Sequence, residues 1–477
     1  MRLRRKIAIA AGGGGLVAAL GGLAAVSMPA IAGTTAAAAQ QATIIIKPGV
    51  LHVGHAQQQP PTTAQCEAAF SVACYEPAQI QQAYNLHPLY SHGVTGKGST
   101  IVIVDSFGSP TIKSDLNFFD KTFGLPAPPS FKILQPAGAV PPYDPTNSDM
   151  VGWAGETTLD VEYAHTIAPG ANIVLVETPV SETEGVTGFP QIVTAEKYVI
   201  NHHIGDVISQ SFSATEETFS SKASVDSLRG AYIDAYKHHV TVLAASGDSG
   251  AADVGLDGST YYLFPVTSWP DSDPLVTGVG GTQLHLTASG NHTSADTVWN
   301  DTYSVATNQF IFGDNGPNPL AGGGGKSIWF SRPSYQNNKY VRSVVGRSRG
   351  VPDISMSGAC NGAVDVYQSF GGQPAGWYPT CGTSEATPLF AGIVALAAQV
   401  AHHSLGLINP ELYFMSENHL RGIVPVTSGN NTVSFTQNGK EYTVKGFNAH
   451  KIYSLAAGVG TVNGAWFVPE LAFLARH

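Results

Sequence analysis

Residues 381–403 read CGTSEATPLFAGIVALAAQVAHH, and this stretch decides the fold that we expect. Its apolar residues occupy nearly every side of a helix rather than one stripe, which is typical of a helix buried in a core. Ser384 stands at the start of this helix, where unpaired backbone N–H groups and the positive end of the helix dipole meet a side chain. The stretch therefore predicts a buried central helix with a serine at its N-terminal end.

Strand-like and helix-like segments alternate upstream of this helix. The strand-like segments are nearly continuous runs of apolar and β-branched residues, which indicates strands buried on both faces. The expected strands are 99–107, 172–178, 206–213 and 240–247, and the expected helices are 111–124, 155–168, 191–203 and 224–239. The pattern predicts an α/β fold with a doubly wound, mostly parallel sheet and helices on both faces.

The composition is that of a globular protein with few charges. Hydrophobic residues make up 43% of the 477 residues and charged residues 12%, about half the usual share of roughly 25%. The net charge of −10 assumes neutral histidines, and protonation of the 16 histidines and of carboxylates turns the balance positive in acid. The sequence has no basic run with interleaved aromatic residues, so we expect no nucleic-acid partner.

The N-terminus is typical of an exported protein. A basic start is followed by a long apolar run, and Ala30-x-Ala32 offers a cleavage site before Gly33. We therefore expect a signal peptide over 1–32, with an uncleaved membrane anchor as the alternative. Residues 33–75 are rich in Ala, Gln, Thr and Pro and predict a flexible leader, and residues 76–477 predict the folded domain. We expect a secreted monomer with no further membrane span and no stable membrane association after signal cleavage.

Export permits disulfides, and the four cysteines fall into two groups. Cys66 and Cys74 lie close in sequence, and Cys360 and Cys381 flank a loop that leads to Ser384. We expect pairing within each group, although spacing alone leaves other pairings open. Neither group has the spacing of a metal site.

The helix predicted over 155–168 carries two carboxylates one turn apart. Glu156 and Asp160 stand at i and i+4, so their side chains share one face. A buried pair would share a proton, with one apparent pKa lowered and the other raised. The ionised member could accept a proton from a serine in acid, where a histidine would already be protonated. The alternative is a solvated acidic face of the helix.

Asp248 follows the strand predicted over 240–247, at the edge of the sheet where α/β folds place their sites. A carboxylate there would repel an oxyanion, whereas a protonated carboxyl would donate a hydrogen bond to it. The alternative for Asp248 is an Asx-turn, and the alternative for Ser384 is a simple N-cap serine.

Together these segments resemble the sedolisin family, the serine-carboxyl peptidases with a subtilisin-like fold. The resemblance runs from about Tyr75 to the C-terminus. Its segments are GETTLDVEYAHTIAPGA (155–171), SGDSGA (246–251), FPVTSWPDSDPLVTGVGGT (264–282), GGGGKSIWFSRPSYQ (322–336), RGVPDISM (349–356) and CGTSEATPLFAG (381–392).

The resemblance implies a role for each candidate. Ser384 is similar to the family's nucleophile, Glu156 to its general base and acid, and Asp160 to the partner that orients the base. Asp248 is similar to the carboxyl that binds the oxyanion. Asp105 stands where a subtilisin-like enzyme keeps its triad aspartate, and we expect it to be structural because the helical pair takes over that role here.

The chain departs from the family at three places. Sedolisins usually have a long pro-segment, and here only a short leader is expected between signal and domain. The family's calcium site uses two aspartates, and Pro425 and Ser454 stand at those positions. Because carboxylates supply most of the attraction for calcium, we expect no metal and no other cofactor. Glu385 follows Ser384, where small residues are usual.

The resemblance implies a secreted, acid-acting serine-type endopeptidase that hydrolyses protein or peptide substrates through an acyl-enzyme on Ser384. Two alternatives stay open. One is a tripeptidyl-type exopeptidase, which would need a free substrate N-terminus. The other is a non-catalytic secreted protein of the same fold that binds peptides.

Overall fold

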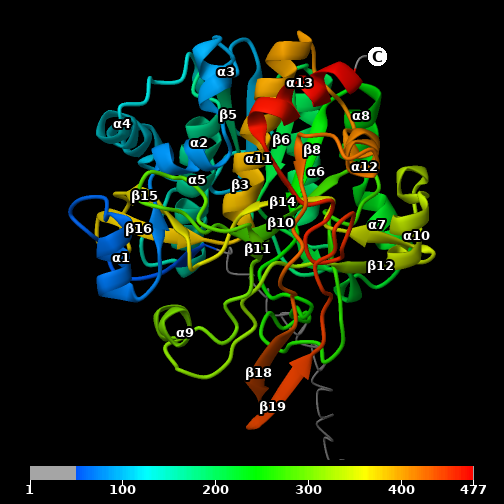
Figure 1. Ribbon diagram of the computed structural model, residues 1–477. Helices are drawn as coiled ribbons and strands as arrows, with labels where there is room; N and C mark the ends of the chain where they lie inside the picture. Colours follow the sequence, from blue (N-terminus) through cyan, green and yellow to red (C-terminus); the bar gives the residue numbers. More distant parts are fainter. Residues whose placement is uncertain (1–49, 476–477) are drawn as a thin grey trace, which may run out of the picture. The chain divides into compact units, whose positions relative to one another are not determined.

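The computed structural model describes residues 50–475, which lie in the compact unit that spans Thr43–His477. The expected signal peptide and the first part of the expected leader lie outside the described residues. The central sheet has the strand order β11-β10-β8-β6-β3-β5-β4, and β14 pairs with β10 (Figure 1). Its strands are β3 (Thr100–Ser106), β4 (Phe131–Leu134), β5 (Asn172–Thr178), β6 (Val207–Gln210), β8 (Thr241–Ala245), β10 (Thr277–Gln283), β11 (Thr297–Val298) and β14 (Ile354–Ser357). Every pairing is parallel except β10 with β11, which confirms the predicted mostly parallel sheet.

Helices cover both faces of this sheet. In β3, Ile101 and Ile103 pack into the core formed with α5 (Ser148–Ile167) and α11 (Thr383–Ala401). The alternate residues Val102 and Val104 pack into a second core on the opposite face. The helices of that second core are α6 (Phe189–Asn201), α7 (Lys222–Leu228) and α8 (Gly230–Lys237). Burial on both faces explains why the strand has no polar positions in its middle.

The helix α11 is the buried central helix that its sequence predicts. All residues from Thr383 to Ala398 are buried. Gly392 lets α11 approach α5 closely, because a Cβ there would lie 2.5 Å from the Cβ of Ile167 and 3.2 Å from the carbonyl oxygen of Ala164. This contact fixes the distance between the helix that carries Ser384 and the helix that carries the carboxylate pair.

The sequence led us to expect no membrane span beyond the N-terminal one. Among the described residues, α11 is nevertheless long and apolar enough to cross a membrane, judged by length and composition. In the fold, 83% of its apolar window is buried inside the protein. Packing in the core therefore accounts for its composition.

Residues 51–75, which we expect to belong to a flexible leader, form regular structure instead. A second sheet has the order β1-β16-β15-β2, so this segment supplies both of its edge strands. The elements are β1 (Leu51–His52), α1 (Thr63–Phe70), β2 (Cys74–Tyr75), β15 (Ala363–Gln368) and β16 (Gly376–Cys381). Backbone pairing with β15 and β16 and burial of Val53 and Phe70 hold the segment in place. Local composition does not show these long-range pairings.

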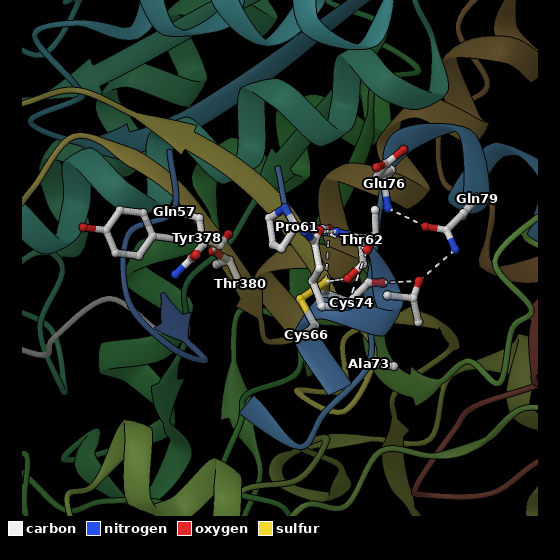
Figure 2. The surroundings of a disulfide bond; sticks show 12 residues. Gln57, Pro61, Thr62, Cys66, Ala73, Cys74, Glu76, Gln79, Tyr378 and Thr380 are labelled. Carbon is white, nitrogen blue, oxygen red and sulfur yellow. Dashed lines mark hydrogen bonds between the residues drawn. A yellow bond between two sulfur atoms is a disulfide. The ribbon is translucent and has the colours of Figure 1, made fainter. Parts of the chain in front are cut away.

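Both expected disulfides form. Cys66 pairs with Cys74 beside the start of α1, where Thr62 caps the helix (Figure 2). Cys360 pairs with Cys381, which ends β16 three residues before Ser384. The second disulfide therefore ties the start of α11 to the segment between β14 and β15.

The remaining elements surround these two sheets. The helix predicted over 224–239 forms as two helices, α7 and α8, divided at Arg229 next to Gly230, because glycine has a low helix propensity. The other helices are α2 (Pro77–Ala83), α3 (His87–Ser91), α4 (Ile112–Phe123), η1 (Glu216–Thr218), α9 (Val305–Ile311), η2 (Ser334–Gln336), α10 (Lys339–Val345), α12 (Asn409–Glu417) and α13 (Gly464–Leu474). The other strands are β7 (Ala214–Thr215), β9 (Ser268–Trp269), β12 (Gly325–Ser331), β13 (Ser348–Val351), β17 (Ile423–Val424), β18 (Val433–Gln437), β19 (Lys440–Val444) and β20 (Thr461–Val462).

Candidate active site

The candidate residues meet at the carboxyl edge of the central sheet. Asp105 lies near the end of β3, Ser211 directly after β6, and Asp248 shortly after β8. These three strands are neighbours in the sheet. Parallel strands bring their carboxyl ends to one edge, which is where α/β folds place ligands. The helices α5 and α11 add Glu156 and Ser384 to the same edge.

Glu156 and Asp160 form a buried carboxyl pair on α5. Both side chains have an exposed fraction of 0%, so a solvated acidic face is excluded. Burial raises the pKa of each carboxyl well above its ordinary value, and the negative charge of Asp105 raises both pKa values further. The Oγ of Ser211 donates a hydrogen bond of 2.7 Å to Oδ1 of Asp160. Such neighbouring carboxyls hold protons in common, so part of the cluster stays neutral in acid.

Glu156 lies next to the hydroxyl of Ser384. The Ser384 and Ser211 hydroxyls are close enough to lower the pKa of Glu156 against the stronger effect of burial. Neither oxygen of Glu156 has a hydrogen-bond partner in hydrogen-bonding geometry among the described residues. In its ionised form this carboxylate could therefore accept a proton.

Ser384 lies inside the first turn of α11 and is not its N-cap. The N-cap is Gly382, whose φ of 129° lies in the region that favours glycine. Ser384 has an exposed fraction of 3% and borders a cavity of about 490 Å³, which Asp248 also borders. The serine thus lies at the wall of a space that could hold a ligand.

Asp248 caps the start of α11. Its Oδ1 accepts hydrogen bonds of 2.7 Å from both the backbone N–H and the Oγ1 hydroxyl of Thr383. The N–H of Gly247 donates in turn to Oγ1 of Thr383 at 3.2 Å. Among the described residues none donates to Oδ2 of Asp248. Burial raises the pKa of Asp248 to about 6, so in acid this carboxyl holds a proton that it can donate from Oδ2.

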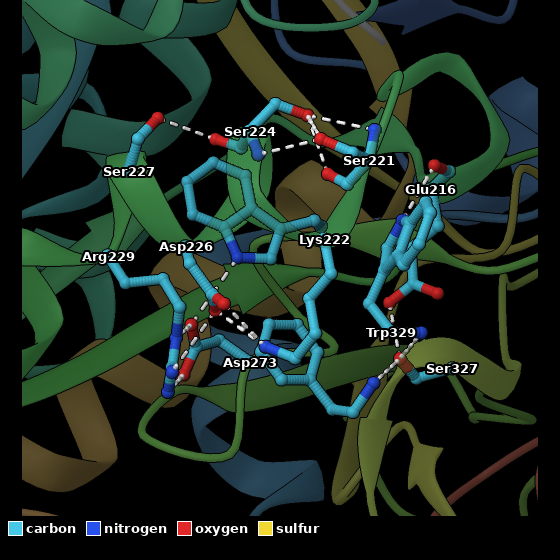
Figure 3. Close-up of polar contacts among 12 residues, drawn as sticks. Glu216, Ser221, Lys222, Ser224, Asp226, Ser227, Arg229, Asp273, Ser327 and Trp329 are labelled. Atoms are coloured by element: carbon cyan, nitrogen blue, oxygen red, sulfur yellow. Dashed lines mark hydrogen bonds and ion pairs between the residues drawn. The ribbon is translucent and has the colours of Figure 1, made fainter.

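The segment after β6 forms one wall of the cavity, and Glu216 lies a few residues further along the chain. Ser211, Phe212 and Ser213 line the cavity. The carboxylate of Glu216 accepts hydrogen bonds from the Ser327 hydroxyl (2.6 Å), and its backbone oxygen accepts one from the Trp329 indole (2.9 Å), as Figure 3 shows. These contacts tie η1, which follows the wall segment, to β12.

Sequence reasoning singled out Asp105 but assigned it no part in this cluster, and it missed the side chain of Ser211. We expect Asp105 to be structural, and Ser211 stands in the segment 206–213, which we expect only as a strand. The structure places the Asp105 charge near both members of the Glu156–Asp160 pair, and the Ser211 side chain binds Asp160. Both residues stand at or just after the carboxyl end of a predicted buried strand, and that position could have marked them as site candidates.

The two residues at the family's calcium positions do not fit a calcium ion. Pro425, which follows β17, has no side-chain ligand atom. The hydroxyl of Ser454 already accepts a hydrogen bond of 3.1 Å from the N–H of Ala457. Among the described residues, one group of three metal-binding side chains lies close together, and two of its members are the disulfide-bonded Cys66 and Cys74.

The buried carboxyls predict a fold that is most stable in acid. Burial raises the pKa of Glu196 to about 8, of Asp105 to about 7 and of Asp248 to about 6. These groups favour the folded state below the unfolded value near 4, and that stability is lost as the pH rises through the folded values. Burial lowers the pKa of His52 and His165 to about 4, which opposes the trend below pH 6.5, but more carboxyls than histidines are shifted.

We therefore expect the melting temperature at pH 4 to exceed that at pH 8 by roughly 10 °C. Thermal unfolding followed by circular dichroism across pH 3 to 8 measures this difference. In Glu196→Gln the difference should shrink, because that carboxyl can no longer ionise. A melting temperature that rises steadily from pH 4 to pH 8 would contradict the prediction.

Comparison with known proteins identifies relatives of this chain. The Subtilase family (Peptidase_S8) matches residues 147–445. Kumamolisin from Bacillus sp. (strain MN-32) is 31% identical over 365 residues, covering 76% of this chain and 58% of the relative. Sedolisin from Pseudomonas sp. (strain 101) is 27% identical over 407 residues, which cover 84% of this chain and 62% of the relative. Tripeptidyl-peptidase 1 from Homo sapiens is 30% identical over 294 residues, which cover 58% of this chain and 45% of the relative.

A solved structure shows the same fold. Pseudomonas sedolisin, a serine-carboxyl proteinase complexed with two molecules of pseudo-iodotyrostatin, matches with a TM-score of 0.67 and 24% identity. The match covers 85% of this chain and 100% of that chain. The chain belongs to the subtilase family and, within it, to the sedolisins. It spans between 45% and 62% of the length of the three curated relatives described above.

Proposed function

We propose that this chain is an acid-acting serine peptidase that cleaves peptide bonds through an acyl-enzyme on Ser384. The observation that carries the proposal is the buried Glu156–Asp160 pair beside Ser384, with Asp248 on the same cavity. A serine nucleophile needs a base within reach, and Glu156 is the group in position to serve. Kinship with the sedolisins supports the same assignment.

The chemistry follows from these positions. Glu156 takes the proton of the Ser384 hydroxyl as Oγ attacks the substrate carbonyl carbon, and a tetrahedral oxyanion forms. Protonated Asp248 donates a hydrogen bond to this oxyanion. Glu156 then gives the proton to the leaving amine, and the C–N bond breaks. Water hydrolyses the acyl-enzyme by the same steps, with Glu156 again as the base.

Asp160 and Ser211 act on this reaction through Glu156. The Ser211 hydroxyl fixes Asp160 by a hydrogen bond of 2.7 Å. Asp160, one turn from Glu156, holds and orients the proton that the two carboxyls share. Both residues are positioning residues because neither borders the scissile bond in this scheme.

Asp248→Asn tests the oxyanion donor. The amide oxygen can accept the hydrogen bonds from Thr383, and the amide N–H donates at any pH. We expect activity in acid to stay within about tenfold of the wild type, whereas Asp248→Ala should lose roughly 10²–10³-fold. The fall of kcat with rising pH near 6 should move to higher pH in the asparagine variant. An unchanged pH profile would argue against a role for the Asp248 proton.

The proposed function itself is tested by cleavage of an unfolded protein substrate across pH 2 to 8. Cleavage confined to acid supports the proposal, and cleavage that peaks near neutral pH would require a different base. Folded protein that cleaves nothing at any pH would favour the non-catalytic peptide-binding alternative.

We propose endopeptidase action, with tripeptidyl exopeptidase action as the second candidate because Tripeptidyl-peptidase 1 is among the relatives. Peptides with acetylated and with free N-termini separate the two modes. An endopeptidase cleaves both, whereas an exopeptidase needs the free amine and releases tripeptides.

We propose that the enzyme is secreted and works as a monomer without a metal cofactor. Two disulfides fit an oxidising compartment. Because Pro425 and Ser454 offer no carboxylate, EDTA or added calcium is expected to change the melting temperature by less than about 2 °C. Stoichiometric calcium in the purified protein, measured by elemental analysis, would contradict this expectation.

A further inference from the structure

Six of the 16 histidines form three neighbouring pairs, and each pair directly follows the last residue of a helix. All six side chains are exposed, and the proposed mechanism uses none of them. They are His202 and His203 after α6, His238 and His239 after α8, and His402 and His403 after α11. We call these six residues the histidine patch.

The three pairs lie side by side. The ring centroids of His203 and His238 are 5.1 Å apart, so the pair after α6 meets the pair after α8. The loop after α11 lies against the same place, because a Cβ on Gly406 would stand 3.3 Å from the Cα of His239. The hydroxyl of Thr241, the first residue of β8, donates to the carbonyl oxygen of Gly406 at 2.7 Å. The six histidines therefore belong to one region of the surface.

The histidine patch lies at the amino edge of the central sheet, opposite the candidate active site. The helices α6 and α8 lead into β6 and β8, so their last residues stand beside the first residues of these strands. The helix α11 runs from Ser384 at the carboxyl edge to His402 at the amino edge. A helix rises about 1.5 Å per residue, which separates these two residues by roughly 27 Å along its axis. A partner bound to the patch would leave the cavity beside Ser384 open.

The backbone fixes where the histidines stand. One member of each pair has a positive φ, which is 52° at His203, 55° at His239 and 64° at His402. A residue in this conformation ends a helix and turns the chain sharply. Protonation of the histidines therefore adds charge to a surface that is already assembled.

The other charges near the patch nearly balance at neutral pH. Asp234 on α8 lies 3.6 Å from the ammonium of Lys197 on α6 and 3.2 Å from that of Lys237. Asp206, before β6, accepts a hydrogen bond from the hydroxyl of Ser404 in the loop after α11. This loop leads into α12, whose first turn contains one more carboxylate, that of Glu411.

Two basic side chains flank the end of α11. Gln399 accepts a hydrogen bond of 2.9 Å from the N–H of Lys97 and donates one of 2.8 Å to the carbonyl oxygen of Gly93, next to His92. The side chains of Lys97 and His92 are exposed. The region thus has as many lysines as carboxylates, and its histidines decide its charge.

Histidine is the side chain that ordinarily changes charge between about pH 5 and 8. The patch is therefore close to neutral above this range and concentrates positive charge below it. A polymer with repeated acidic groups can meet several imidazolium groups at once, which strengthens binding beyond that of a single ion pair. The charge of the patch in acid thus fits an anionic polymer.

Two exposed tyrosines stand beside the histidines. Tyr198 is 41% exposed, and its ring stacks on that of His202 with the centroids 4.1 Å apart. Tyr236 is 57% exposed and precedes His238 by two residues. A tyrosine ring offers an apolar face for the C–H groups of a sugar ring while its hydroxyl stays in water. These rings favour a polysaccharide as the anionic polymer.

We propose that the histidine patch binds an anionic polysaccharide in acid and releases it near neutral pH. The imidazolium groups contact the acidic groups of the polymer, and Tyr198 and Tyr236 pack against its sugar rings. Because the patch lies at the far end of α11 from Ser384, the bound protein keeps its cavity accessible. Binding at this surface does not depend on the reaction at Ser384.

The experiment measures binding of the full chain to dextran sulfate beads at pH 4.5 and 7.5, because sulfate groups keep their charge over this range. The patch variant changes the member of each pair that lacks a positive φ: His202→Gln, His238→Gln and His403→Gln. The control variant changes three exposed histidines elsewhere: His55→Gln, His292→Gln and His450→Gln. Both variants lose the same number of histidines, so a general effect of net charge would weaken both equally.

We expect the wild type to bind at least about tenfold more tightly at pH 4.5 than at pH 7.5, and the patch variant to lose about tenfold at pH 4.5. The control variant should lose less than about twofold. Lysine at the same three patch positions should keep binding at pH 4.5 and extend it to pH 7.5, because lysine stays charged. Equal losses in the two glutamine variants, or equal wild-type binding at both pH values, overturn the inference.

Two further measurements identify the partner. Replacing Tyr198 and Tyr236 together by alanine should weaken binding to dextran sulfate severalfold without changing its pH dependence. Vesicles of phosphatidylglycerol that bind more tightly than dextran sulfate, with the same loss in the patch variant, would reject the polysaccharide in favour of a membrane. Cleavage of a short neutral peptide should be equal in the wild type and the patch variant, which separates this surface from the proposed function.

Discussion

Ser384→Ala is expected to lower kcat for an unfolded protein substrate at acid pH by roughly 10⁴–10⁶-fold, because the attacking oxygen is removed. The substitution deletes one atom from a side chain whose exposed fraction is 3% and leaves the apolar packing of α11 unchanged. Thermal unfolding and near-ultraviolet circular dichroism should therefore match the wild type. The loss of activity would then reflect chemistry and not misfolding.

Thr387→Val is the matched control for this variant. Thr387 lies on α11 about one turn beyond Ser384, is fully buried, and donates its hydroxyl to the backbone oxygen of Thr383. Valine removes that hydroxyl with nearly the same shape, and we expect most of the activity to remain. A Ser384→Ala preparation, free of wild-type enzyme, that keeps more than a few per cent of the activity would refute the assignment of the nucleophile.

Glu156→Gln is expected to lower kcat by about 10⁴-fold, the second largest effect. Glutamine has nearly the size of glutamate but cannot accept the proton of the Ser384 hydroxyl. The substitution also removes one member of a buried carboxyl cluster, so the fold should gain stability above pH 6. Lower activity together with a higher melting temperature at neutral pH distinguishes a lost base from a damaged fold.

Glu162→Gln provides the control on the same helix. Glu162 is as buried as Glu156, and its pKa is also raised well above the ordinary value by burial. Its Oε2 accepts a hydrogen bond from the N–H of Tyr367 at 3.1 Å, which a glutamine oxygen can also accept. This variant should keep nearly full activity. Equal losses in Glu156→Gln and Glu162→Gln would mean that general burial of acids on α5, and not base catalysis, explains the effect.

The central sheet and the candidate residues on α5 and α11 could be predicted because their signals are local. Buried strands have continuous apolar runs, and the spacing of Glu156 and Asp160 places them on one face wherever the helix forms. The resemblance to the sedolisin family then identifies Ser384 and Asp248 as candidate site residues. The structure adds that all four residues stand at one edge of one sheet.

The features that could not be predicted from the sequence depend on contacts between distant segments. Residues 51–75 look flexible from composition, but their stability comes from pairing with strands that lie about 290 to 330 residues further along the chain. Ser211 has no distinguishing signal in the sequence. Only the fold, with β6 next to β3, brings its hydroxyl to Asp160 on α5. Glu182 gives no local signal that it lies buried at the wall of a cavity, because only the folded chain forms that cavity.

The hydrogen bonds from Thr383 to Asp248 have a consequence for the timing of catalysis. Because the carboxyl of Asp248 accepts two hydrogen bonds from the residue next to Ser384, the proposed proton donor and the proposed nucleophile are tied to the same turn of α11. Substrate entry therefore need not assemble these two groups. Any slow rearrangement during turnover would have to occur in the walls that receive the peptide, and the reaction centre would be ready before the substrate arrives.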